Sequence, residues 1–223
     1  MPAEALGVRK GVTAVIGGGG KTTLLRTLGE ELARSGARVI LSTTTKFLPF
    51  PGIETVSGGE REVAEALART PLVCAAAPWG ESGKLAESPV PMARLAALAD
   101  YVLVEADGSA GLPLKAHAPH EPVIPAESGR VLLVVGASGF GRPVREAAHR
   151  PGRYAQLAGC DIETAVTPEI AARVLRAEGL GDLVLVNQAE TPEAREMARK
   201  MAESLPLPVW AGSLWRGEMV CVS

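Results

Sequence analysis

Short apolar runs rich in β-branched residues alternate along the chain with segments whose apolar positions recur at helical spacing. The runs have the length of strands buried on both faces. They cover residues 12–16, 38–42, 101–105, 131–135 and 183–187. Helical spacing is found over residues 24–33, 60–69, 92–99, 169–178 and 192–204. This alternation predicts an α/β fold in three layers, a mainly parallel sheet with helices on both faces.

Local signals refine the ends of some elements. Gly36 follows the first helical segment as a C-cap, while Thr191 and Pro192 have the residue types favoured at a helix N-cap and first turn. The stretch 78–91 contains proline, glycine and serine with little periodicity. A surface loop is predicted there.

Composition limits the classes of protein to consider. A chain of 223 residues with 47% hydrophobic residues can bury one ordinary core, and a single domain spanning residues 1–223 is expected. The net charge of -2 gives no general attraction to nucleic acid or to an anionic membrane. No run approaches the roughly 18 apolar residues that cross a bilayer. Three scattered cysteines (Cys74, Cys160 and Cys221) predict free thiols. A soluble, cytoplasmic protein is expected.

A run of glycines follows the first predicted strand and precedes the first predicted helix. Gly17, Gly18, Gly19 and Gly20 are followed by Lys21, Thr22 and Thr23. Without Cβ atoms these glycines let backbone N–H groups approach a phosphate, and the lysine can reach terminal phosphate oxygens. The Thr22 hydroxyl could bind a Mg²⁺ ion that bridges those phosphates. The segment therefore predicts a P-loop NTPase-like protein that uses Mg²⁺ with ATP or GTP.

The loop differs from the standard phosphate-binding pattern, because Val15 stands where that pattern has its first glycine. The shorter form that starts at Gly17 looks like the loop of Mur-type ligases and folylpolyglutamate synthetases. An ATP-dependent ligase that activates a carboxylate is therefore an alternative, although Mur enzymes carry further substrate domains. A glycine-rich turn that binds nothing is the other reading of the same residues.

The residues that follow the predicted strands are further candidates, since ligands of open parallel sheets bind at the carboxyl ends of strands. Glu105 and Asp107 lie on the same side of an extended segment and could hold the water shell of Mg²⁺ or orient an attacking water. Lys46, after three threonines, could contact a phosphate or an acidic substrate, or could be a solvated lysine. Solvated acids are the alternative for the two carboxylates.

The segment 111–125 combines prolines, Lys115 and two histidines in one predicted loop. Lys115 is a candidate for a second phosphate or substrate contact. His117 and His120 could bind a metal, but the spacing supplies no third ligand.

Asn187 follows the last strong strand at the point where guanine-binding P-loop proteins carry Asn-Lys-x-Asp. Here the second and fourth positions are Gln188 and Glu190. The Glu190 carboxylate could receive the N–H groups of guanine, or Asn187 could finish the strand and Glu190 precede a helix cap. The choice between ATP and GTP stays open.

Several motifs together resemble the YqeC family. They are Gly-Gly-Gly-Gly-Lys-Thr-Thr at 17–23, Thr-Thr-Thr-Lys at 43–46, Val-Glu-Ala-Asp-Gly-Ser at 104–109, Gly-Leu-Pro-Leu-Lys-Ala at 111–116, His-Glu-Pro-Val-Ile-Pro at 120–125 and His-Arg-Pro at 149–151. That family is described as an accessory of selenium-dependent molybdenum hydroxylases. The resemblance implies a P-loop fold, a role in maturing a selenium- or molybdenum-containing cofactor, and a molybdenum hydroxylase or its maturation proteins as partners.

The residues and the resemblance together favour an NTPase or phosphoryl-transfer accessory protein, which could act as a homodimer. Its phosphates would be held by residues 17–23 and its Mg²⁺ by Thr22 with Glu105 or Asp107. Lys46 and Lys115 would neutralise developing charge. A nucleotide-gated binding module without efficient turnover is the remaining alternative.

Overall fold

The computed structural model describes residues 2–223, which form two compact units. Unit 1 comprises the described residues up to Val15 together with Thr22–Gly108 and Val123–Arg130. Unit 2 comprises Ile16–Lys21, Ser109–Pro122 and Val131–Ser223. Neither unit is one continuous stretch of chain, and the expectation of a single domain stays a prediction.

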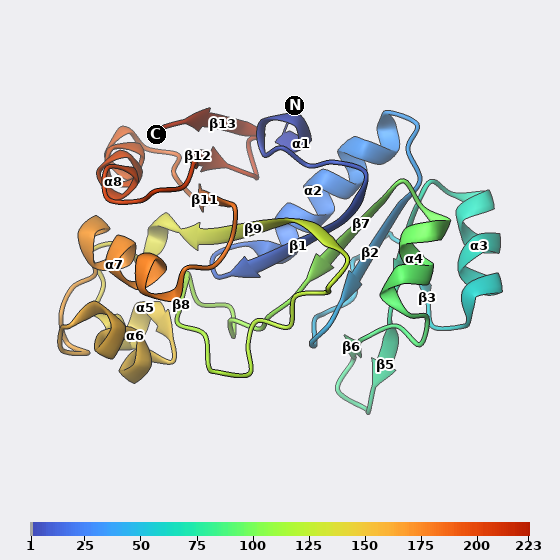
Figure 1. Ribbon diagram of the computed structural model, residues 1–223, viewed down its shortest axis with the longest axis horizontal. Helices are drawn as coiled ribbons and strands as arrows, with labels where there is room; N and C mark the ends of the chain where they lie inside the picture. Colours follow the sequence, from blue (N-terminus) through green and yellow to red (C-terminus); the bar gives the residue numbers. More distant parts are fainter. Residues whose placement is uncertain (1) are drawn as a thin grey trace. The chain divides into compact units, whose positions relative to one another are not determined.

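The sheet of unit 1 is entirely parallel, as the buried apolar runs predict (Figure 1). Its strands lie in the order β1, β7, β2, β4 and β3. Their bounds are β1 Gly11–Gly17, β7 Tyr101–Glu105, β2 Val39–Thr43, β4 Leu72–Ala75 and β3 Thr55–Val56. Glu105, the last residue of β7, is in register with Val15 of β1 and Thr43 of β2. The end of β7 therefore lies between two neighbouring strand ends.

Helices cover both faces of this sheet, which confirms the predicted layering. Ile40 and Val102 belong to one buried apolar cluster with residues of α3 (Glu60–Arg69) and α4 (Met92–Leu98). The next residue of β2, Leu41, has its side chain on the other face, where a Cβ added to Gly29 of α2 (Lys21–Arg34) would be 3.0 Å from Leu41 Cδ2. Successive residues of one strand thus point to helices on opposite faces of the sheet. A short helix, α1 (Pro2–Ala5), precedes β1.

The predicted surface loop 78–91 is wrong in part, because it contains most of an antiparallel hairpin. Strand β5 (Ala77–Trp79) pairs with β6 (Lys84–Ala86). Leu85 of β6 is buried and exchanges two backbone hydrogen bonds with Phe47, at 3.0 and 2.8 Å. The hairpin is held by these tertiary contacts, and its strands are too short to give a periodic signal in the sequence.

Unit 2 contains three parallel strands and one antiparallel edge strand, in the order β9, β11, β12 and β13 (Figure 1). Their bounds are β9 Ser128–Gly136, β11 Leu183–Asn187, β12 Val209–Ser213 and β13 Glu218–Cys221. The unit also contains β8 Leu114–Lys115, β10 Ala148–His149, the 3₁₀ helix η1 Ala137–Gly139, and helices α5 Val144–Ala147, α6 Pro151–Ala158, α7 Pro168–Glu178 and α8 Pro192–Ala202. Thr191 is the N-cap of α8, since its hydroxyl accepts a 3.2 Å hydrogen bond from Ala194 N. The predicted start of that helix is confirmed.

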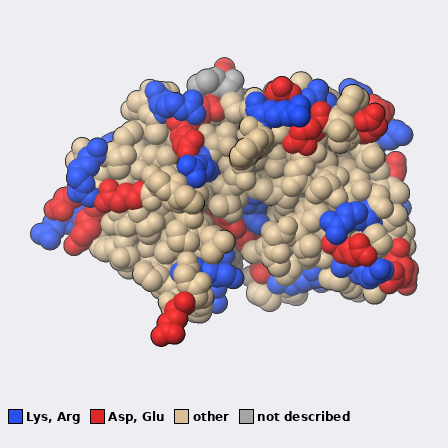
Figure 2. Space-filling model, turned by 180° about the vertical axis from the view of Figure 1, so that it is seen from behind, with Lys and Arg blue, Asp and Glu red and all other residues tan. Residues whose placement is uncertain are grey.

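The surface carries both signs of charge. Basic and acidic side chains lie side by side on the face shown in Figure 2. Ion pairs occur in both units, such as Arg94 Nη2 with Glu60 Oε1 at 2.7 Å and Arg195 Nη2 with Glu218 Oε2 at 3.1 Å. Within residues 2–223, every helix is too short or too polar to span a bilayer. The expectation that nucleic acid is no partner stays a prediction.

Candidate phosphate-binding site

The glycine loop is packed tightly against other backbone of unit 2. Gly18 N donates to Val134 O at 2.9 Å, and Gly19 N donates to Leu112 O at 3.1 Å. Gly17 and Gly19 have φ values of +99° and +79°, and a Cβ on either would collide with the backbone of β9. Both positions therefore require glycine for conformation and for space. The amides of Gly18 and Gly19 already donate to carbonyl groups of the protein. The backbone N–H groups that donate to a bound phosphate are therefore expected further along the chain, in the first turn of α2.

Lys21 is folded back over the loop that precedes it. Its side chain is buried, and Nζ donates to Gly17 O at 2.7 Å and to Ser109 Oγ at 3.2 Å. Both acceptors are neutral, and a phosphate oxygen would bind an ammonium more strongly than either. Ser109 belongs to the motif 104–109, but its hydroxyl was not among the predicted site residues.

In unit 1, the second residue of α2 contacts the end of β7. Thr22 Oγ1 donates to Glu105 Oε2 at 3.0 Å, and Thr22 is exposed while Glu105 is buried. Thr43 Oγ1 holds the same strand end through a 2.9 Å bond to Glu105 O, and Asp107 is fully buried two residues later. Hydroxyl and carboxylate oxygens are the donors that Mg²⁺ prefers. The pairing of Thr22 with Glu105 thus fits the predicted magnesium ligands.

Lys46 interacts with an aromatic ring of its own unit. Its Nζ lies 3.7 Å from the centroid of a Trp79 ring, on strand β5 of the hairpin. Lys46 is exposed, so this cation–π contact is solvated. A phosphate contact by Lys46 would require the side chain to leave this ring.

Lys115 is paired with a carboxylate in unit 2. Lys115 Nζ lies 2.8 Å from Glu121 Oε2, and its side chain is 0% exposed. Arg150 also binds Glu121 through both ends of its guanidinium, at 2.7 and 3.0 Å. Burial raises the pKa of Glu121, but the hydrogen bonds from Arg150 and Lys115 outweigh it and hold the pKa at about 2. Lys115 therefore already has an anionic partner within the protein.

His117 is likewise bonded to a carboxylate. Its Nδ1 lies 2.8 Å from Glu178 Oε2, its backbone N donates to Glu178 Oε1 at 2.6 Å, and both side chains are only 3% exposed. His120 is exposed. Across residues 2–223, no three His, Cys, Asp or Glu side chains gather as a set of metal ligands. Neither histidine gains support as a metal ligand from these surroundings.

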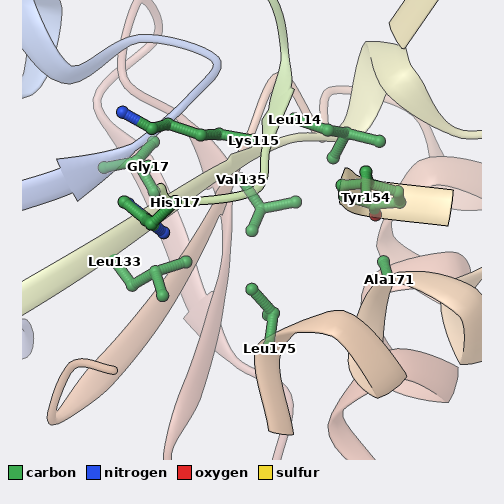
Figure 3. A pocket seen from close by; sticks show the side chains of 10 residues that line it. Gly17, Leu114, Lys115, His117, Leu133, Val135, Tyr154, Ala171 and Leu175 are labelled. Atoms are coloured by element: carbon green, nitrogen blue, oxygen red, sulfur yellow. The ribbon is translucent and has the colours of Figure 1, made fainter. Parts of the chain in front are cut away.

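A small cavity in unit 2 adjoins the glycine loop. Its volume of about 10 Å³ is room for about one water molecule. Gly17, Lys115, His117 and Tyr154 line it together with apolar side chains, as Figure 3 shows. Burial raises the pKa of the Tyr154 hydroxyl above its usual range. The cavity is too small for a nucleotide, so it does not itself mark the ligand site.

Asn187 connects the end of β11 to the glycine loop. Its Nδ2 donates to Gly19 O at 2.8 Å, and its Oδ1 accepts from Leu214 N at 3.0 Å. Gln188 follows with a φ of +64°, and Ser138 Oγ donates to its Oε1 at 2.6 Å. Glu190 is half-buried. Both polar atoms of Asn187 are thus used within the protein, which supports a structural role beside the predicted base contact.

For two of these partners, the residue that each one pairs with could not be predicted from the sequence. Glu178 is the last residue of α7 and lies 61 positions after His117, while Arg150 lies 29 positions after Glu121. Long-range pairs of this kind depend on the tertiary fold, and no spacing rule predicts them. Arg150 does fall within the motif 149–151, which marked its segment without giving its role.

The order of strand, glycine loop and helix, with a lysine at the first helical position and a threonine at the second, defines a P-loop protein. The chain belongs to the YqeC family: the family model described as YqeC protein matches residues 13–152. That range includes the glycine loop, Glu105, Asp107 and Lys115, and it ends before Asn187. The predicted family and fold class are therefore confirmed.

Similar proteins were found at the levels of sequence and structure. The uncharacterized protein YqeC of Escherichia coli (strain K12) is 36% identical over 158 residues, which are 68% of this chain. The match covers only 62% of that relative's length. Among solved structures, FtsY from Mycoplasma mycoides has a TM-score of 0.48 at 12% identity, covering 97% of this chain and 64% of FtsY. The hydrogenase maturation factor HypB from Archaeoglobus fulgidus has a TM-score of 0.43 at 14% identity, covering 97% of this chain and 87% of HypB.

Proposed function

We propose that this protein binds the magnesium complex of ATP or GTP and hydrolyses it or transfers its terminal phosphoryl group. The observation that carries the proposal is the position of Lys21, a buried lysine at the start of α2 whose Nζ lies over the glycine loop, 2.7 Å from Gly17 O. The start of a helix favours anions, and the buried ammonium adds a full positive charge. On binding, Lys21 Nζ donates charge-assisted hydrogen bonds to phosphate oxygens.

The metal ligands in this proposal are Thr22 and one of the carboxylates Glu105 and Asp107. Because Thr22 follows Lys21 directly in the chain, a metal held by the Thr22 hydroxyl accompanies phosphates held by Lys21. These side chains would hold Mg²⁺, and the chemistry it would supply is neutralisation of phosphate charge. The carboxylate that does not hold the metal orients a water molecule for attack. Thr23 contributes its backbone amide to the first turn of α2.

The remaining predicted residues contribute to nucleotide binding in this proposal without being the principal phosphate or metal ligands. Lys46 and Lys115 supply further positive charge once they leave Trp79 and Glu121, respectively. Asn187 acts through Gly19, which it holds, and Glu190 is our candidate for the edge of the base. Whether the base is adenine or guanine depends on the reach of the Glu190 carboxylate.

For the cellular role, we propose that nucleotide binding assists the maturation of a selenium-dependent molybdenum hydroxylase in the cytoplasm. The support is membership of the YqeC family, together with the motifs that carry the resemblance. The proposed partners are the hydroxylase or its maturation proteins, and the proposed state is a homodimer. A cell that depends on such a hydroxylase should lose hydroxylase activity without this protein and regain it with the wild-type gene but not with Lys21→Ala. Full activity with Lys21→Ala would separate the cellular role from nucleotide binding.

The binding proposal is tested by isothermal titration with ATP and with GTP, each with and without Mg²⁺. We expect magnesium-dependent binding of at least one nucleotide and a loss of about 100-fold in affinity in Lys21→Ala, since charge-assisted bonds to phosphate are each worth about 1.5–3 kcal/mol. Lys10→Ala is a matched control, because Lys10 is a surface lysine that pairs with Asp100 at 2.9 Å. A folded Lys21→Ala protein with unchanged affinity would exclude Lys21 as the phosphate ligand.

Phosphate release then separates an enzyme from a nucleotide-gated binding module. An NTPase releases phosphate at a rate that depends on Mg²⁺ and on Glu105 or Asp107. A gated module binds nucleotide with negligible release and captures its partner only in the nucleotide-bound state.

A further inference from the structure

The turn between β12 and β13 in unit 2 carries an unusually exposed aromatic residue. Trp215 is 92% exposed, the highest value among the large exposed hydrophobic side chains of residues 2–223. Trp79, by comparison, is 47% exposed and lies beside Lys46. Because its ring is almost fully exposed, the Trp215 indole has a face on which a flat ligand can stack.

The backbone of this turn is held in place, although the indole is exposed. Ser213 is buried, and its Oγ accepts a 3.3 Å hydrogen bond from Arg216 N. Ser213 is also in antiparallel register with Glu218 of β13. These contacts hold the backbone on both sides of Trp215.

The residue before the tryptophan is connected to the glycine loop. Leu214 N donates to Asn187 Oδ1 at 3.0 Å, and Asn187 Nδ2 donates to Gly19 O at 2.8 Å. The Leu214 side chain is buried, and its Cδ1 lies 4.0 Å from the place where Gly20 would carry a Cβ. Trp215 is thus one residue away from a residue that is bonded, through Asn187, to the glycine loop.

We propose that the Trp215 indole stacks on the base of the nucleotide whose phosphates bind at the glycine loop. The inference rests on the proposed function, and it adds the part of the site that receives the base. A nucleobase is flat and weakly hydrated on its faces, and an aromatic side chain is the platform that such faces prefer. Through Asn187, two hydrogen bonds connect Gly19 of the glycine loop to Leu214, the residue before Trp215.

Stacking accepts any base, because every base has a π face. Trp215 therefore strengthens the binding of ATP and of GTP alike, and the choice between them falls to a group that reads the edge of the base, such as Glu190. This division gives the two residues different expected effects. Replacing Trp215 lowers both affinities, while replacing Glu190 changes their ratio.

The test is isothermal titration of the wild type, Trp215→Phe, Trp215→Ala and Val220→Ala with MgATP, MgGTP and inorganic tripolyphosphate. We expect Trp215→Ala to lose about tenfold in affinity for both nucleotides, and Trp215→Phe about threefold or less, because phenylalanine keeps a smaller stacking face. Tripolyphosphate has no base, so its affinity should be the same in all four proteins. Val220→Ala is the matched control, because it removes an exposed apolar side chain from the neighbouring strand β13.

Two results would overturn the inference while leaving the proposed function intact. One is unchanged nucleotide affinity in Trp215→Ala. The other is an equal loss for tripolyphosphate and nucleotides, which would mean that Trp215 supports the phosphate loop and not the base. Failure of the wild type to bind either nucleotide would overturn the proposed function and the stacking together.

Fluorescence provides a second measurement on folded protein. In a Trp79→Phe, Trp210→Phe protein, Trp215 is the one remaining tryptophan of the sequence. Nucleotide binding should quench its emission and tripolyphosphate should not. Unchanged emission at saturating nucleotide would contradict stacking.

Discussion

The ends of β7 and β11 look alike in the sequence but differ in the structure. Each strand is a buried apolar run that ends in a polar residue, Glu105 in unit 1 and Asn187 in unit 2. Glu105 is bonded to the exposed Thr22 hydroxyl, whereas both polar atoms of Asn187 are bonded to backbone groups of the protein. A polar residue at a strand end can therefore be placed to bind a ligand, or it can bind backbone groups of the protein and stabilise the loops around it. The partner atoms decide which, and these are known only from the tertiary structure.

The largest effect is expected from Asn187→Ala, because it leaves Gly19 O and Leu214 N without the amide that bonds both. Each buried group left unsatisfied costs about 1–3 kcal/mol, so we expect a loss of about 3 kcal/mol in the free energy of unfolding, measured in urea. Glu190→Gln, three residues later, should unfold like the wild type. If Asn187→Ala is as stable as the wild type but changes the choice of base, then Asn187 is a base ligand and the contrast with Glu105 is lost.

Glu121 extends the comparison to a second carboxylate, and this one holds the scaffold. Its folded pKa of about 2 is below its ordinary value of 4.5, so the charged form is stabilised by folding. This stability is fully present above about pH 4.5 and is lost as the pH falls toward 2. Glu121→Gln should therefore lose about 2 kcal/mol at pH 7, and its difference from the wild type should shrink at pH 3. A difference independent of pH would show that the charge of Glu121 contributes nothing.

The substitution Glu105→Gln distinguishes most clearly between two roles of Glu105, binding Mg²⁺ and stabilising the fold. Glutamine keeps an oxygen that accepts from Thr22 Oγ1 but removes the charge that would attract Mg²⁺. We expect the magnesium concentration that half-saturates nucleotide binding to rise about tenfold, which corresponds to about 1.4 kcal/mol. The urea unfolding curve should change little. A large loss of stability with unchanged magnesium dependence would place Glu105 in the same class as Asn187.

The smallest effect is expected at Lys46, which has an exposed aromatic partner. Lys46→Ala should lower the free energy of unfolding by about 0.5 kcal/mol, the usual size of a solvated cation–π contact. Phosphate release should slow by only about threefold, since Lys46 is a supporting charge in the proposed site. Trp79→Leu should reproduce the change in stability but not the change in rate. A rate loss as large as that of Lys21→Ala would make Lys46 a principal phosphate ligand.

Much of the fold could be predicted because it depends on local pattern. The five apolar runs became β1, β2, β7, β9 and β11, and the helical segments became α2, α3, α4, α7 and α8 within two or three residues at their ends. The hairpin β5–β6 could not be predicted, because it depends on Leu85 pairing with the distant Phe47. Local periodicity gives no information about such a contact.

The candidate site likewise has a part that could be predicted from local sequence and a part that depends on long-range contacts. The glycine loop carries its signal within seven residues, so its place between a strand and a helix could be predicted. The partners of Lys115 and His117 could not, because a lysine or histidine in a loop is equally compatible with a ligand and with a buried ion pair. The role proposed for Trp215 gave no signal either, since only its exposure in the fold distinguishes it from a core tryptophan.

The most direct measurement of the central claim is a titration of ¹⁵N-labelled protein with MgATP and with MgGTP, followed by amide chemical shifts. Binding at the glycine loop predicts that the largest shifts occur at the amides of residues 17–23, with smaller shifts at Glu105 and Trp215, and that Lys21→Ala abolishes them at the same nucleotide concentration. Unchanged amides at residues 17–23 at saturating nucleotide, or shifts confined to another part of the chain, would contradict the assignment of this loop as the nucleotide site.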